Sequence, residues 1–161
     1  MLRLILMRHA KSAWDTDAND DHARPLNERG LRDAPAMGER LAQMGWVPDL
    51  TLCSDALRTM QTWEAVQQVL PRDVPTKYSR NLYHTGIGIL QPLISEQPDR
   101  VKTLMAVGHN PGWEQAANWF SGERQSMTTA NAVLLQSTQT RWPAAALERW
   151  ELVAWLRPKE L

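Results

Sequence analysis

The chain has 161 residues and carries 18 basic and 18 acidic side chains, so its formal net charge at pH 7 is zero. This balance argues against a function in which bulk charge attracts nucleic acid or a membrane surface, and no stretch approaches the roughly 20 apolar residues that a membrane-spanning helix needs. We expect a single domain over residues 1–161, located in the cytoplasm, because the lone Cys53 cannot form an internal disulfide and suits a reducing compartment.

The first half of the chain predicts two strands, each followed by a helix. Residues 2–7 (LRLILM) form a short apolar run, which is typical of a buried strand. Apolar side chains at helical spacing predict a helix over 27–45. We expect a kink or the start of a second helix at Pro35, because proline cannot donate the backbone hydrogen bond that a helix requires. Residues 48–54 predict the next strand, and residues 55–70 predict the next helix.

The second half continues this alternation and ends with two strands. The expected elements, in chain order, are a short strand (76–83), a short helix interrupted by Pro92 (87–96), a strand (101–109), a helix (111–120) and two strands (131–138 and 146–156). Strands that alternate with helices indicate an α/β fold with a mostly parallel sheet.

Polar groups follow three of the apolar strands at the point where each strand ends. Arg8 and His9 follow the first strand. Ser54 ends the second, with Arg58 one turn into the next helix, and His109 ends the run LMAVGH. Ligands bind beyond the carboxyl ends of the strands in open α/β sheets, so two arginines and two histidines can meet at one edge. Guanidinium groups grip a tetrahedral oxyanion by paired hydrogen bonds, and a histidine can attack phosphorus and carry the phosphoryl group.

Each of these residues has a plainer interpretation when it is taken singly. A lone histidine after a strand is more often solvated or structural, a lone arginine is often a surface cation, and Ser54 can cap the helix that follows it. The sequence GHNPG can be a simple turn. His22 and His84 fall in expected loops, where a surface position is favoured. No GxxxxGK[ST] loop is present to cradle a nucleoside triphosphate.

Four motifs in order, LMRHAKSAWD, PLNERG, CSDALRTMQT and VGHNPG, resemble those of the histidine phosphatase superfamily. The variant RHAKS, with RPLNERG downstream in a chain this short, is most similar to the phosphohistidine phosphatases of the SixA type. The resemblance covers residues 1 to about 137. It implies a three-layer α/β sandwich of the phosphoglycerate mutase type, in which helices flank a mostly parallel central sheet.

Carried onto this chain, the resemblance implies a catalytic group made of His9, Arg8, Arg58 and His109. His9 is the nucleophile that becomes phosphorylated, Arg8 and Arg58 hold the phosphoryl oxygens, and His109 donates a hydrogen bond to the transferring group. We expect no metal and no other cofactor, because fixed cations can stabilise the charge on the equatorial oxygens. The expected partner is a protein that carries phosphohistidine, or a small phosphorylated substrate.

Two departures from the family pattern bear on the chemistry. Asp15 stands where many members have an asparagine that contacts phosphate. A carboxylate there would repel phosphate, so we expect Asp15 to turn away or to pair with an arginine. The larger members also use an acidic residue to protonate the leaving oxygen, but the segment NLYHTG offers only His84. Glu28, Asp55, Asp21 and His84 are the candidates for a proton donor.

The missing acid favours a substrate whose leaving group needs little help. An alkoxide needs an acid, whereas imidazole, with a free side-chain pKa of about 6.5, leaves readily. We therefore expect a metal-independent phosphatase that acts on phosphohistidine through His9. The alternatives are a small-molecule phosphomonoester phosphatase of the same superfamily and a non-catalytic phosphate-binding module. A mutase is disfavoured, because the chain lacks long insertions that would enclose a substrate between transfers.

Overall fold

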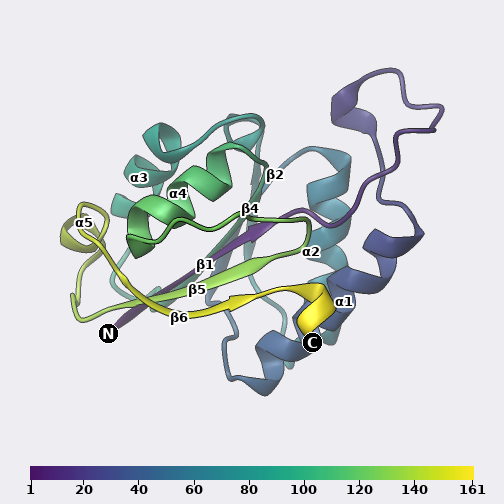
Figure 1. The fold of residues 1–161 in the computed structure, drawn as a ribbon. Helices are drawn as coiled ribbons and strands as arrows, with labels where there is room; N and C mark the ends of the chain where they lie inside the picture. Colours follow the sequence, from purple (N-terminus) through teal and green to yellow (C-terminus); the bar gives the residue numbers. More distant parts are fainter.

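The computed structural model describes all 161 residues and has a six-stranded sheet at its centre (Figure 1). The strands are β1 (Leu2–Arg8), β2 (Leu50–Ser54), β3 (Thr76–Ser79), β4 (Thr103–Gly108), β5 (Ala132–Ser137) and β6 (Glu151–Leu156). They lie in the order β3-β2-β4-β1-β5-β6. Neighbouring strands are parallel from β3 to β1, while β5 is antiparallel to both β1 and β6. The prediction of a mostly parallel sheet is confirmed.

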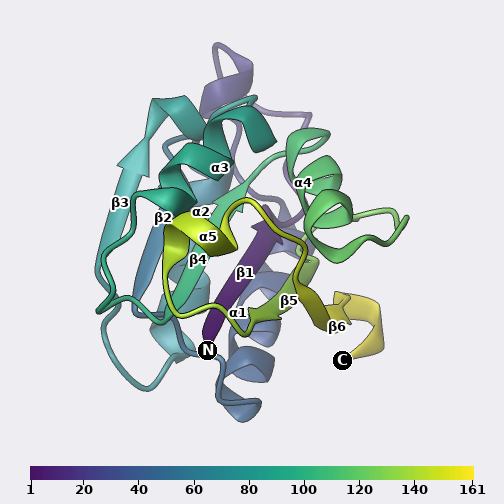
Figure 2. The ribbon, with the colours of Figure 1, turned by 90° about the vertical axis from the view of Figure 1, so that its left-hand side faces the viewer.

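Helices cover both faces of this sheet, which gives the three-layer α/β sandwich that the sequence predicts (Figures 1 and 2). One face carries α1 (Glu28–Gln43) and α2 (Leu57–Val69), and the other carries α3 (Ile87–Ser95), α4 (Gly112–Ser121) and α5 (Trp142–Ala145). Short 3-10 turns lie at Asp21–Ala23, Arg80–Leu82 and Pro158–Glu160. None of the helices is long and apolar enough to cross a membrane.

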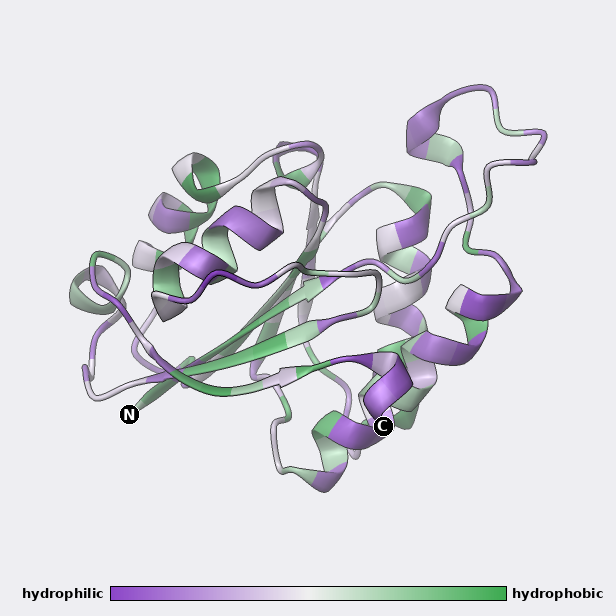
Figure 3. Ribbon diagram, in the orientation of Figure 1, coloured by the Kyte–Doolittle hydropathy of each residue, from purple (hydrophilic) through white to green (hydrophobic).

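The strand β1 shows why this sequence forms a sheet that is covered on both faces. Leu2, Leu4 and Leu6 are fully buried in the core beneath α3, α4 and α5. Ile5 and Met7 are fully buried in the core beneath α1 and α2. Two-sided burial demands a continuous apolar run, and Figure 3 shows hydrophobic residues concentrated along the central strands. Burying each such side chain contributes about 1.5–3 kcal/mol.

No second helix begins at Pro35, Pro92 does not interrupt its helix, and two strand boundaries differ from the sequence expectations. The helix α1 runs through Pro35 without dividing in two, and α3 runs through Pro92. The buried face of each helix outweighs the one backbone donor that its proline lacks. The strand β3 ends at Ser79, opposite the last residue of β2, because it has no partner beyond that point. The last strand begins at Glu151, later than expected, after the short helix α5.

A close backbone approach joins the start of α4 to the loop that precedes α3. A Cβ atom on Gly112 would lie 1.7 Å from the carbonyl oxygen of Thr85 and 2.8 Å from the Cα of Gly86. Only glycine can occupy this position without moving the backbone. The approach fixes the 83–86 loop against the segment that follows His109.

We predict that Gly112→Ala lowers the free energy of unfolding by about 1–3 kcal/mol, because the added methyl group overpacks the contact with Thr85. Gly88 is the matched control, since it lies in α3 and a methyl group added there would meet no atom within 4 Å. Gly88→Ala should raise the free energy of unfolding by about 0.5–1 kcal/mol. Urea denaturation followed by circular dichroism measures both. Equal unfolding midpoints for Gly112→Ala and the wild type would contradict the prediction.

Candidate active site

The carboxyl ends of three parallel strands bring the predicted site residues together. Arg8, the last residue of β1, pairs in register with Gly108, the last residue of β4. The next backbone N–H, that of His9, donates to the Gly108 carbonyl at 3.0 Å. The rings of His9 and His109 therefore lie close, with centroids 5.4 Å apart. Arg58 enters from the first turn of α2, directly beyond β2.

Arg8, His9, Arg58 and His109 all line one cleft of about 290 Å³. The other residues that line it are Lys11, Ser12, Trp14, Asp21, Arg24, His84, Asn110 and Thr129. The cleft is strongly basic, because Asp21 is its one carboxylate among four cationic side chains. The positive charge of this cleft suits an anion such as a phosphoryl group.

His9 is held with one ring nitrogen engaged and the other available. Its side chain is 7% exposed, and Nδ1–H donates to the Ala10 carbonyl at 2.7 Å. The lone pair of the neutral ring is then on Nε2, which makes no hydrogen bond. Burial, together with the charges of Arg58, Arg8 and Arg24, lowers the pKa of His9 to about 3, against the opposing effect of the Ala10 hydrogen bond. The imidazole is therefore neutral at physiological pH, as a nucleophile must be.

His109 is oriented by Ser54, which the sequence suggested only as a helix cap. The Ser54 hydroxyl is fully buried, lies 2.8 Å from His109 Nε2 and accepts from the Ala56 N–H at 3.2 Å. When the Ser54 hydroxyl donates to Nε2, the ring proton is on Nδ1. Burial, with the nearby charges of His9 and Arg58, lowers the pKa of His109 to about 2. The helix itself begins after Ala56, so the capping interpretation of Ser54 is replaced by an orienting one.

Three buried polar atoms of this cleft have no hydrogen-bond partner within the protein. They are Arg8 Nε, Arg58 Nε and His109 Nδ1. Buried polar groups are normally satisfied, so unpaired donors gathered around one cleft indicate a site for an acceptor-rich ligand. Arg8 is held in place through a terminal nitrogen, because Nη1 donates to the Met127 carbonyl at 3.0 Å.

Asp21 anchors Arg58 and is the central polar contact of the cleft. Arg58 Nη1 donates to its carbonyl oxygen at 2.7 Å and Nη2 donates to its Oδ2 at 2.9 Å. Arg24 Nε donates to Oδ1 at 3.0 Å, and the Tyr83 hydroxyl donates to Oδ2. Burial opposes ionisation of Asp21, but these hydrogen bonds outweigh it and hold the pKa of the carboxyl well below its usual range. In the sequence, the only indication that Asp21 would hold Arg58 was the acidic composition of its loop.

The four candidate proton donors fall into two groups. Glu28 is exposed at the start of α1 and Asp55 accepts from His22 Nε2 at 2.6 Å, and neither lines the cleft. Asp21 and His84 do line it. Asp15 is exposed and makes no ion pair, so of the two expected outcomes it turns away from the arginines.

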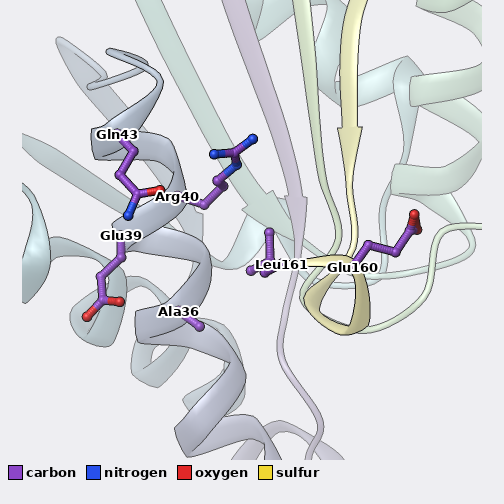
Figure 4. A pocket seen from close by; sticks show the side chains of 6 residues that line it. All are labelled: Ala36, Glu39, Arg40, Gln43, Glu160 and Leu161. Atoms are coloured by element: carbon purple, nitrogen blue, oxygen red, sulfur yellow. The ribbon is translucent and has the colours of Figure 1, made fainter.

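A larger hollow of about 520 Å³ lies between α1 and the C-terminal turn (Figure 4). Its lining side chains are Ala36, Glu39, Arg40, Gln43, Glu160 and Leu161. They include charges of both signs but no imidazole or thiol, and none of the unpartnered buried atoms belongs to them. Nowhere in the chain do three or more His, Cys, Asp or Glu side chains gather as they would to hold a metal ion. The basic cleft is where the four predicted site residues converge.

Two curated proteins are similar to this chain in sequence. A protein of Arabidopsis thaliana, described as an uncharacterized chloroplastic protein, is 39% identical over 153 residues, which span 89% of this chain and 70% of the relative. An uncharacterized protein of Mycobacterium tuberculosis is 40% identical over 105 residues, which span 65% of this chain and just under two thirds, 63%, of that relative.

Solved structures show the same relationship in three dimensions. A structure from Agrobacterium tumefaciens, assigned as the phosphohistidine phosphatase SixA, superposes with a TM-score of 0.84 at 30% identity over 98% of both chains. The protein histidine phosphatase SixA complexed with tungstate shares the fold, with a TM-score of 0.81 at 22% identity over 99% of both chains. The family model of the histidine phosphatase superfamily (branch 1) matches residues 4–135. The chain belongs to the histidine phosphatase superfamily.

Proposed function

We propose that this protein removes phosphate from phosphohistidine in other proteins, through a phosphoryl group carried on His9. The observation that carries the proposal is a neutral, buried imidazole with a free Nε2 in a cleft lined by Arg8, Arg58 and a second neutral imidazole. Histidine Nε2 can attack phosphorus directly, because it needs no base when it is already unprotonated.

Charge in the cleft suits the transition state of phosphoryl transfer. Negative charge spreads over three equatorial oxygens as the phosphoryl group moves, and fixed donors stabilise it best. Arg8 and Arg58 supply guanidinium donors, and His109 Nδ1 supplies the imidazole donor. Asp21 keeps Arg58 from rotating away, because it holds two of the guanidinium nitrogens.

The leaving group that best fits this cleft is an imidazole. Asp21 is ionised, and Asp55 and Glu28 lie outside the cleft, so no carboxylic acid is available to protonate an alkoxide. An imidazole departs as a neutral ring when its other ring nitrogen carries a proton, which a ring with a free side-chain pKa of about 6.5 can hold near neutral pH. The relatives described as SixA phosphohistidine phosphatases support the same substrate class. We place the partner phosphoprotein in the cytoplasm, which the free, buried Cys53 suits.

The experiment that tests this proposal compares three substrates: a phosphohistidine peptide, a phosphoserine peptide and a sugar phosphate. We expect kcat/KM to be highest for the phosphohistidine peptide by about 100-fold or more, because an alkoxide is a far poorer leaving group than an imidazole. Release of inorganic phosphate is the measurement. Equal kcat/KM on the sugar phosphate would favour the small-molecule phosphatase instead. Phosphate binding without release from any substrate would identify a binding module.

His9→Ala should reduce turnover by about three orders of magnitude or more, because no second nucleophile can take its place. Rapid acid-free quenching with a ³²P-labelled substrate should trap label on wild-type protein and none on the variant. Circular dichroism should show that the variant is folded. Near-normal turnover by His9→Ala would remove His9 from the reaction.

Arg58→Lys should lower kcat/KM by about 10- to 100-fold, because a lysine keeps the charge but loses the planar fork and its charged hydrogen bonds. Arg8→Lys should behave in the same way. Arg29→Lys is the matched control, since Arg29 forms an exposed pair with Asp33 at 3.4 Å and does not line the cleft. If all three variants kept the wild-type kcat/KM, the two arginines would not hold the phosphoryl group.

A further inference from the structure

The loop that follows β3 carries an imidazole to the mouth of the cleft. His84 lines the cleft, and its ring centroid lies 5.6 Å from that of His109. Its side chain is 54% exposed, so it can meet the part of a substrate that projects outward from the phosphoryl group. The Gly112–Thr85 approach fixes the backbone immediately beyond it.

The backbone at His84 has an uncommon conformation. Its φ is 50°, in the left-handed region that non-glycine residues seldom adopt. Such conformations persist where the surroundings impose them, and they cluster at functional sites.

Asp21 holds this imidazole by one nitrogen. His84 Nε2–H donates to Asp21 Oδ2 at 3.1 Å, and Nδ1 makes no hydrogen bond. The Tyr83 ring packs against the His84 ring with centroids 3.9 Å apart. A carboxylate that accepts from one ring nitrogen orients an imidazole and leaves the other nitrogen to exchange a proton, which is the role that histidine plays in general acid and base catalysis.

We infer that His84 is the proton donor to the leaving group, and that Asp21 is the positioning residue that holds it. This inference rests on the proposed function. Of the four titratable candidates, Glu28 and Asp55 lie outside the cleft, and Asp21 is itself a hydrogen-bond acceptor for Arg58, Arg24 and Tyr83. Among these four candidates, only His84 lines the cleft with a ring nitrogen free.

The proton follows a closed cycle. His9 Nε2 forms a bond to phosphorus while the bond from phosphorus to the leaving group breaks. The proton of the His84 imidazolium goes to the leaving oxygen of an ester, or to the ring nitrogen of phosphohistidine that is not bonded to phosphorus. Water then attacks phosphorus on His9 and gives a proton to neutral His84. Inorganic phosphate departs, and both histidines return to their starting states.

The test measures how the rate depends on the leaving group. His84→Gln and the wild type are compared on 4-nitrophenyl phosphate, whose leaving group needs no acid, and on phenyl phosphate, whose leaving group does. We expect His84→Gln to slow phenyl phosphate about 100-fold or more, within the range of general acid catalysis, and 4-nitrophenyl phosphate by only about threefold. Added imidazole should restore part of the rate of His84→Ala on phenyl phosphate.

His22→Gln is the matched control, because His22 also donates to a carboxylate, Asp55, but does not line the cleft. Its ratio of rates on the two esters should equal that of the wild type. Vanadate binding by calorimetry shows whether each variant keeps an intact anion site. The proton-donor inference is overturned if His84→Gln binds vanadate and the hydrolysis of both esters is slowed equally, or if the hydrolysis of neither ester is slowed. The proposed function stands in either case. If the wild type releases phosphate from no substrate, the proposed function fails and the inference fails with it.

Discussion

The parallel pairing of β1 with β4 is the interaction on which the rest of the site depends. It aligns Arg8 with Gly108, so that the residues that follow each strand, His9 and His109, leave the sheet side by side. The pairing of β2 with the other side of β4 then brings Ser54 and the start of α2 to the same edge. Strand register is rigid, because a slip of one residue would turn every side chain to the opposite face. The apolar cores on both faces therefore fix the positions of the polar groups beyond them.

The electrostatics of the cleft follows from the close placement of two histidines and two arginines at one edge of the sheet. Buried imidazoles next to two guanidinium groups bind protons poorly, so His9 and His109 stay neutral while the arginines keep their charge. The cluster of cations needs an anion nearby, and Asp21 supplies one through its contacts with Arg24 and Arg58. Its position on the 3-10 turn beside Arg58 leaves both Arg58 Nε and His109 Nδ1 unpaired. One carboxylate thus restrains the arginine and leaves donors for the phosphoryl oxygens.

Two loops complete the lining of the cleft beyond the strand ends. The segment after His9 places Trp14 over the Arg24 guanidinium at 3.6 Å, and the 83–86 loop places His84 on the other part of the cleft lining. Both loops are tied to the same carboxylate, since Arg24 and His84 each donate to Asp21. The sheet positions Arg8, His9 and His109, while these loops supply the rest of the cleft lining that Asp21 ties together.

The sequence by itself determined the α/β class, the order of most elements and the group Arg8, His9, Arg58 and His109. The elements could be predicted because the apolar period of each strand is local, whereas the four residues were singled out by the resemblance of their motifs to the histidine phosphatase superfamily. The tertiary structure alone decided the role of Ser54, the anchoring of Arg58 by Asp21 and the placement of His84. These contacts join residues far apart in the chain, 37 positions for Asp21 with Arg58 and 63 for Asp21 with His84. No local pattern encodes such pairs, because they form only when separate loops are packed against one edge of the sheet.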